Sequence, residues 1–186
     1  MTDTQRGYFG VGVEGISKPG NVGNLVRSAH AFGASFVFFI KPETDVQDIR
    51  VSDTSNAGTH VPHYIYPAVS ELVLPEDCTL VGIELTEDAI ELPSFRHPLR
   101  AAYVFGPELG SLSPELIKKC AYIVRIPTKF CINVGMAGVV TLYDRMISLG
   151  KFAERPVRVG GPRTSPLTKG RPGGRPISCV QTVPNP

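Results

Sequence analysis

Four short, almost continuous apolar runs constrain the fold of this chain of 186 residues more than any other feature. The runs are SFVFFI (35–40), TLVGIEL (79–85), AAYVFG (101–106) and AYIVRI (121–126). Runs without polar alternation are typical of strands that are buried on both faces of a parallel sheet. YFGVGVE (8–14) predicts a further strand, and a short one is expected near residues 63–66.

Segments with helical character lie between these strands. A helix is predicted over 22–33, closed by Gly33, and another over 134–150. In the second segment apolar residues recur at helical spacing, namely Val139, Leu142, Met146 and Leu149.

Ser113, followed by proline and glutamate, predicts the start of one more helix, because a hydroxyl cap, a proline and an acid favour the first turn. Weaker patterns predict helices over 46–57 and 67–73. This alternation of strands and helices predicts an α/β domain with a mostly parallel sheet.

The C-terminal segment differs in composition from the remainder of the chain. Residues 153–186 contain six basic residues, one acidic residue, seven prolines and five glycines, so they carry a charge of +5. Residues 1–152 contain 13 basic and 16 acidic residues, which gives −3. We therefore predict a folded domain over 1–152 and a disordered basic tail over 153–186. The tail serves either as a solubilising extension or as a non-specific contact to phosphates.

Several broad classes of protein are disfavoured. No apolar run approaches the ~20 residues that cross a membrane, and MTDTQRGYFG lacks the pattern of a secretory signal. The four cysteines are scattered without a C-x-x-C pair, which favours a reducing cytoplasm over a disulfide framework or zinc site. His60 and His63 have no nearby partner ligands, so no metal site is predicted.

Residues 10–15 spell G-x-G-x-x-G, the fingerprint of dinucleotide binding. The fingerprint functions only where it joins a strand to a helix whose N-terminus meets the pyrophosphate. Here the glycines fall within the predicted strand, and the helix begins beyond Pro19. We therefore reject a nicotinamide or flavin site at this position.

Three other segments carry candidate chemistry. In PGNVGNLVR (19–27), Asn21 is placed to cap a helix and Arg27 adds a permanent cation. In FGPE (105–108), Gly106 allows close approach of a ligand and Glu108 lies at the carboxyl edge of the sheet, where α/β proteins bind ligands.

The third segment, IPTKFCINV (126–134), follows another predicted strand. Asn133 is a candidate cap of the final helix, and Cys131 is small enough to fill core space. Turns, caps and core packing explain each of the three segments when it is taken alone.

Together, and in this order, the three segments resemble the signature motifs of the SpoU/TrmH family of RNA methyltransferases, in the SPOUT superfamily. The N-x-x-x-x-x-R run of that family corresponds to Asn21 and Arg27, which precede Ala31-Phe32-Gly33. Its FGxE…GLS run corresponds to residues 105–113, and its IPM…SLNV…LYE run to residues 126–144. The resemblance spans about residues 8–150 and leaves out the tail.

The chain departs from the family pattern at a few positions. Thr128 replaces a methionine, Cys131-Ile132 replaces Ser-Leu, Asp144 replaces a glutamate, and Ser111 is an extra residue. None of these changes removes a charged or amide group on which the family depends. Cys131 lies where family members often use a serine hydroxyl.

The resemblance implies a parallel sheet with helices on both faces and a C-terminal trefoil knot. It also implies that S-adenosylmethionine binds where three strand ends meet, between backbone groups and apolar side chains. The implied cofactor-binding residues are Leu85, Gly106, Pro107, Glu108, Ile126, Cys131, Ile132 and Asn133.

The implied reaction is methyl transfer to a ribose 2′-hydroxyl of RNA, and the implied catalytic residues are Arg27, Asn21, Glu108 and Asn133. The central role falls to Arg27, through transient loss of its proton or through stabilisation of the developing alkoxide. The two asparagines orient substrate and loops, while Glu108 holds the catalytic region or the ribose in place.

The resemblance further implies a homodimer with the site near its two-fold interface, and the helix around Val139 to Met146 as a contact surface. The chain begins almost directly with the first strand, so the dimer groove, loops and basic tail are expected to recognise RNA. Transfer RNA is the expected substrate, and ribosomal RNA is the alternative. A non-catalytic RNA-binding relative and an unrelated α/β nucleotide- or phosphate-binding enzyme stay open as rival classes.

Overall fold

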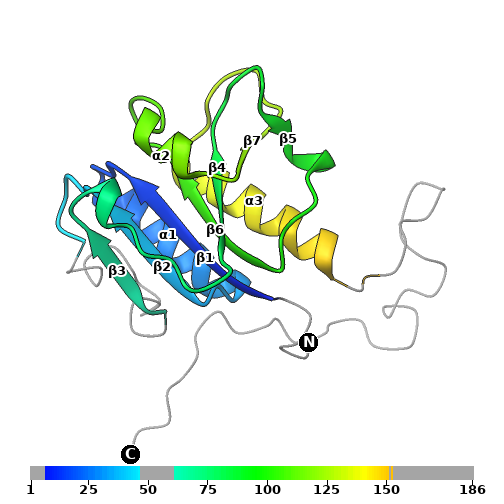
Figure 1. The fold of residues 1–186 in the computed structure, drawn as a ribbon, viewed down its shortest axis with the longest axis horizontal. Helices are drawn as coiled ribbons and strands as arrows, with labels where there is room; N and C mark the ends of the chain where they lie inside the picture. Colours follow the sequence, from blue (N-terminus) through cyan, green and yellow to red (C-terminus); the bar gives the residue numbers. More distant parts are fainter. Residues whose placement is uncertain (1–6, 47–60, 151, 153–186) are drawn as a thin grey trace, which may run out of the picture. The chain divides into compact units, whose positions relative to one another are not determined.

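The computed structural model describes residues 7–46, 61–150 and 152. In this part of the chain, seven strands form one sheet in the order β3-β2-β1-β6-β4-β7-β5, and all neighbours are parallel (Figure 1). The strands are β1 (Tyr8–Glu14), β2 (Phe36–Ile40), β3 (His63–Tyr66), β4 (Thr79–Ile83), β5 (Ile90–Glu91), β6 (Arg100–Phe105) and β7 (Tyr122–Arg125). The predicted α/β class with a parallel sheet is confirmed.

The described chain contains three α-helices and two 3-10 turns, and all of them except the last helix, which follows the last strand, lie between strands. They are α1 (Pro19–Phe32), η4 (Val69–Glu71), η5 (Leu92–Ser94), α2 (Pro114–Lys119) and α3 (Val134–Leu149). As predicted, α1 closes at Gly33 with a left-handed φ of 75°, and Ser113 caps the start of α2, where its hydroxyl accepts the Leu116 N–H at 3.2 Å. None of the described helices is long and apolar enough to cross a membrane.

Helices cover both faces of the sheet. On one face, α1 and α3 pack on apolar side chains of β1, β2, β4 and β6, with Tyr103 fully buried among them. On the other face, α2 and η4 pack on a second cluster that contains Phe38 and Val104. The expectation of helices on both faces is confirmed.

The glycines of the G-x-G-x-x-G run serve packing. Gly10 and Gly12 lie within β1, and the rings of Phe36 and Phe38 on neighbouring β2 lie against them. A Cβ atom at either glycine would come within 2.3 Å of a ring carbon. The strand and the later start of α1 at Pro19 confirm that this run does not join a strand to a helix N-terminus.

The sequence-based expectation for the start of α1 is wrong. The helix begins at Pro19 with Lys18 as its N-cap, so Asn21 lies in the first turn and does not cap it. Proline is favoured there because the first N–H groups of a helix have no partners within the helix. The side chain of Asn21 is 7% exposed and bonds to other segments instead.

One other local prediction also needs correction, and one strand was missed. The helix predicted over 67–73 is the single 3-10 turn η4, after which Leu72 is extended and the chain approaches Pro75, which disfavours helical backbone at the residue before it. The two-residue strand β5 was not predicted, because so short a segment carries no periodicity. The helix predicted over 46–57 lies outside the described residues except for Val46.

Candidate functional site

A cavity of about 270 Å³ opens at the carboxyl edge of the sheet, where three adjacent strands end. The loops that follow β4, β6 and β7 form its walls, together with the first turn of α3 and Lys18 before α1. Its lining residues are Lys18, Ile83, Glu84, Leu85, Phe105, Gly106, Pro107, Glu108, Gly110, Ile126, Thr128, Cys131, Ile132, Asn133, Val134 and Ala137. Ligand pockets of parallel α/β proteins occur at this edge.

The cavity brings together most of the residues singled out from the sequence. All eight side chains or backbone positions expected to contact a cofactor line it. Of the expected catalytic residues, Glu108 and Asn133 line it as well, and Asn21 is bonded to both. Arg27 is exposed on α1 and is not among the lining residues.

Glu108 is bonded to the N-terminal end of α1. One carboxylate oxygen accepts the N–H and the hydroxyl of Ser17, at 3.1 and 3.0 Å. The other accepts the N–H of Lys18 at 3.1 Å and the side-chain amide of Asn21 at 2.9 Å. A helix N-terminus offers unpaired N–H groups and a positive dipole end, so it is a favourable place for a carboxylate.

These contacts change the acidity of Glu108. Burial raises its pKa, but the hydrogen bonds from Asn21 and from the backbone of Ser17, Glu108 itself and Lys18 outweigh that effect and lower the pKa to about 2. Glu108 is therefore ionised at neutral pH and is unsuited to act there as a proton acceptor.

Asn133 links the cavity to both helices on its face of the sheet. Its side-chain oxygen caps α3 by accepting the N–H of Gly135 at 2.9 Å and of Met136 at 3.4 Å. Its amide donates to the side-chain oxygen of Asn21 at 3.0 Å. Asn21 in turn donates to Glu108, so one chain of hydrogen bonds joins α3, α1 and the loop after β6.

Two further carboxylates hold the loop after β6, and no sequence motif marks either of them. Glu84 follows β4 and lines the cavity, where its oxygens accept the N–H of Leu85 at 2.9 Å and of Leu112 at 2.7 Å. Glu14 ends β1 and accepts the N–H of Ser113 at 2.8 Å. Neither glutamate belongs to a recognisable local motif, because their partners in this loop, Leu112 and Ser113, lie 28 and 99 residues away.

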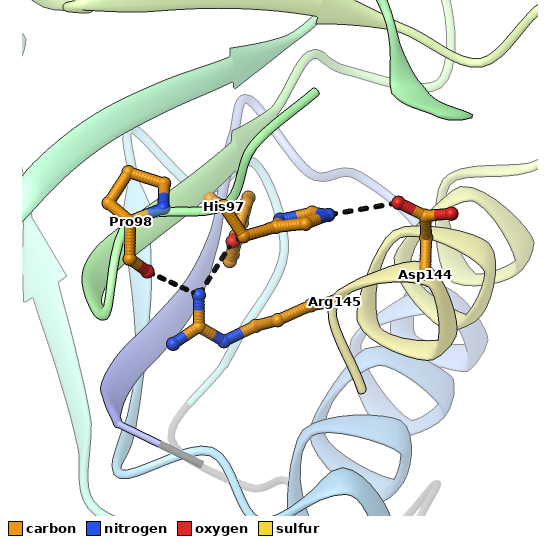
Figure 2. Close-up of polar contacts among 5 residues, drawn as sticks. His97, Pro98, Asp144 and Arg145 are labelled. Atoms are coloured by element: carbon orange, nitrogen blue, oxygen red, sulfur yellow. Dashed lines mark hydrogen bonds and ion pairs between the residues drawn. The ribbon is translucent and has the colours of Figure 1, made fainter. Parts of the chain in front are cut away.

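A second polar cluster joins α3 to the segment before β6 (Figure 2). Arg145 is 2% exposed and donates to the carbonyls of Pro98 at 2.6 Å and Leu99 at 2.9 Å, and to the Tyr103 hydroxyl at 2.9 Å. Its guanidinium also lies over the ring of Phe9, 4.6 Å from the centroid. This cluster lies outside the lining of the cavity and holds α3 against β6 and the segment that precedes it.

His97 completes the cluster. Its ring nitrogens lie 2.9 Å from a carboxylate oxygen of Asp144 and 2.6 Å from the hydroxyl of Tyr103. Burial lowers the pKa of His97, and Arg145 adds to this effect against the opposing influence of Asp144. A neutral ring with its proton on Nε2 satisfies both contacts, since Nε2 donates to Asp144 while Nδ1 accepts from Tyr103.

Comparison with known proteins shows which family this chain belongs to. The SpoU rRNA Methylase family matches residues 9–143, most of the chain, and the chain therefore belongs to this family. The resemblance drawn from the three sequence segments is confirmed.

Individual relatives are distant. The mouse (Mus musculus) tRNA (guanosine(18)-2'-O)-methyltransferase TARBP1 is 25% identical over 138 residues, in a match that covers 69% of this chain and 9% of TARBP1. The SpoU methyltransferase AviRb from Streptomyces viridochromogenes matches with a TM-score of 0.68 and 24% identity over 75% of this chain and 59% of AviRb. The structure of AviRb in complex with the cofactor AdoMet matches with a TM-score of 0.65 and 24% identity, over 76% of this chain and 60% of AviRb. The chain thus spans less than two thirds of each of these proteins.

Proposed function

We propose that this chain transfers a methyl group from S-adenosylmethionine to a ribose 2′-hydroxyl of RNA, with transfer RNA as the favoured substrate. The observation that carries the proposal is the convergence of all eight expected cofactor residues on one cavity, beside the hydrogen-bonded set Asn21, Glu108 and Asn133. Membership of the SpoU family and the AdoMet complex of AviRb support the cofactor.

The cavity has the chemistry that an adenosyl group requires. Ile126 and Ile132 offer apolar surface for a purine ring, and the strand-end loops offer backbone N–H and C=O groups to its polar edge. Gly106 lets the loop after β6 fold back closely on itself, because a Cβ at this position would lie only 3.0 Å from the backbone N of Leu112. When bound, S-adenosylmethionine supplies a methyl group activated by the sulfonium. The residues of this chain then align the two reactants.

Arg27 is the proposed catalytic group. Its guanidinium either stabilises the developing alkoxide of the ribose or gives up a proton transiently beside a phosphate. Glu108 stays charged and fixes the loop after β6 to α1. The hydrogen bond between Asn21 and Asn133 then joins α1 and this loop to the start of α3. The position of Arg27 outside the cavity lining supports a site that a second copy of the chain completes.

We propose that this second copy forms a homodimer through α3. Three side chains spaced one and two turns apart on α3 are exposed despite their apolar character, namely Met136 (63%), Val140 (38%) and Tyr143 (49%). An apolar stripe of this kind suits an isologous contact with an identical helix.

We also propose the trefoil knot of the family. The last strand, β7, lies between β4 and β5, which are consecutive in the sequence, so the chain re-enters the sheet between two strands already connected to each other. Residues 126–150 then return beside the segment 97–99, to which Arg145 is bonded. A crystallographic trace of residues 84–150 tests the threading directly.

The decisive experiment is transfer of labelled methyl from S-adenosylmethionine into total RNA, followed by mapping of the labelled fraction. We expect label in transfer RNA, at a nucleotide that resists alkaline hydrolysis on its 3′ side because its 2′-hydroxyl is blocked. Label confined to ribosomal RNA would identify the alternative substrate. Cofactor binding without label in any RNA would instead identify a non-catalytic RNA-binding relative.

A further inference from the structure

The lining of the cavity contains three charged side chains, and the two carboxylates among them differ in how many hydrogen bonds they accept. The three side chains are Lys18, Glu84 and Glu108. A carboxylate has about four lone-pair positions for donors. In the described part of the chain Glu108 accepts four hydrogen bonds from residues 17, 18 and 21, which occupy its capacity at the side of α1. Glu84 accepts two, so its carboxylate retains capacity toward the cavity that it lines.

We propose that Glu84 is a cofactor-recognition residue whose negative charge makes the cavity prefer a sulfonium cation to a neutral thioether. This inference rests on the proposed function, because S-adenosylmethionine carries the sulfonium and S-adenosylhomocysteine, the product of methyl transfer, carries the thioether. The two molecules have nearly the same shape, so apolar contacts and backbone hydrogen bonds discriminate little between them. A fixed charge in the cavity wall does discriminate, and it favours the substrate cofactor over the product.

The charge of Glu84 is held in place before any ligand binds. Its oxygens accept the N–H groups of Leu85, in the loop after β4, and of Leu112, in the loop after β6. A Cβ at Gly106 would lie 3.5 Å from one of these oxygens, so the carboxylate stands directly beside the loop after β6. Preorganised charges are worth more than mobile ones, because no reorganisation is needed when the ligand arrives.

Glu14 offers a matched control. It is 6% exposed, and it holds the N–H of Ser113, the residue next to the one that Glu84 holds. It does not line the cavity. The two glutamates therefore share the structural task of fixing this loop, and only Glu84 presents its charge to the cavity.

The test is isothermal titration calorimetry of S-adenosylmethionine and S-adenosylhomocysteine with the full-length chain, Glu84→Gln and Glu14→Gln. In Glu84→Gln we expect the affinity for S-adenosylmethionine to fall about tenfold relative to that for S-adenosylhomocysteine. In Glu14→Gln the ratio of the two affinities stays at its original value, because any loosening of the loop affects both ligands alike. A ratio that is unchanged in Glu84→Gln, or that changes equally in both variants, overturns the proposal.

Two further measurements do not depend on the folding of Glu84→Gln. Glu84→Asp keeps the charge and should keep the preference, so a loss of preference in this variant with intact binding of S-adenosylhomocysteine counts against the proposal. In the unsubstituted chain, added salt should weaken S-adenosylmethionine binding more steeply than S-adenosylhomocysteine binding, and equal salt dependence overturns it. If the unsubstituted chain binds neither molecule, the proposed function itself fails, which is a different result from binding without discrimination.

Discussion

Glu108 has a structural task that its place in a ligand-binding motif does not reveal. Its carboxylate gathers donors from Ser17, Lys18 and Asn21, and so fixes the loop after β6 against the start of α1. Because that loop is one wall of the cavity and α1 carries Arg27, one side chain sets the distance between the two. Its charge therefore matters for geometry and stability, whether or not it touches a ligand.

The first prediction concerns the pH dependence that Glu108 contributes. Its pKa is lowered from 4.5 to about 2 by the fold, so its stabilising effect is complete above about pH 4.5 and is lost as the pH falls through about 2. Glu108→Gln should therefore be less stable than the original chain near neutral pH, and the difference should shrink across this window. Urea unfolding at a series of pH values measures it. Glu87→Gln, which removes an exposed carboxylate, is the control; a constant difference for Glu108→Gln down to about pH 2 would contradict the prediction.

The second prediction concerns Arg27. Arg27→Ala should lower methyl transfer into RNA by at least about 100-fold, since electrostatic stabilisation of a developing oxyanion commonly contributes that much. Binding of S-adenosylmethionine should be unchanged, because Arg27 does not line the cavity of its own chain. Arg96→Ala removes another exposed arginine and should retain activity. Turnover by Arg27→Ala close to that of Arg96→Ala would remove Arg27 from the catalytic role.

At the scale of elements, the sheet order explains why the cavity forms where it does. β6, β4 and β7 are adjacent, so the loops that follow them meet at one edge although they are separated in the sequence. The apolar runs around 79–85, 101–106 and 121–126 suffice to predict these strands, because apolar runs without polar alternation are typical of a parallel sheet, although Tyr122 of β7 is exposed. The motif residues that follow each strand could therefore be predicted to converge.

Other features could not be predicted, and the reason is the range of the interactions. Asn21 was expected to cap its own helix, yet its partners are Glu108 and Asn133, 87 and 112 residues away. The roles of Glu84 and Glu14 depend on backbone N–H groups of a distant loop, which any residue type would offer. Side chains whose partners are backbone groups leave no complementary residue type in the sequence to mark the pair.

The third prediction concerns the attachment of α3. Arg145→Met should lower the free energy of unfolding by about 3 kcal/mol, because it leaves the Pro98 and Leu99 carbonyls and the Tyr103 hydroxyl without a buried donor. Arg125 makes the matched control: its side chain is 30% exposed and pairs with Glu91 at 2.9 Å. Arg125→Met should cost less than about 1 kcal/mol, as surface ion pairs usually do. Equal losses in urea unfolding would show that the cluster around Arg145 stabilises no more than a surface pair.

The fourth prediction concerns the exposed stripe of α3. Tyr143→Glu should convert the proposed homodimer into a monomer, because it introduces a charge into an apolar contact where each copy faces the other. Light scattering gives the mass of each form. Tyr122→Glu alters a similarly exposed tyrosine (45%) on β7 and should leave the dimer intact. A monomeric mass for the original chain at working concentration would contradict the proposed dimer itself.

At the scale of the whole molecule, charge is divided unevenly along the chain. Residues 1–152 carry a net charge of −3, whereas residues 153–186 carry +5. Residues 153–186 lie outside the part of the chain that the structure describes. A domain with net negative charge gains nothing from non-specific attraction to RNA, whose backbone is itself an array of negative charges. We therefore expect the tail to attract RNA non-specifically and the domain to select the nucleotide that is methylated.

The fifth prediction follows from this division. Deletion of residues 153–186 should raise the KM for RNA at low salt and leave kcat and the affinity for S-adenosylmethionine unchanged, because the tail acts before the reactants are aligned. The difference in KM should vanish as salt is raised, since attraction by the six basic residues is screened. A full-length variant with those six residues changed to glutamine separates charge from length, and it should behave like the deletion. An unchanged KM at low salt would leave the tail with the solubilising role, whereas a loss of kcat would place part of it within the site.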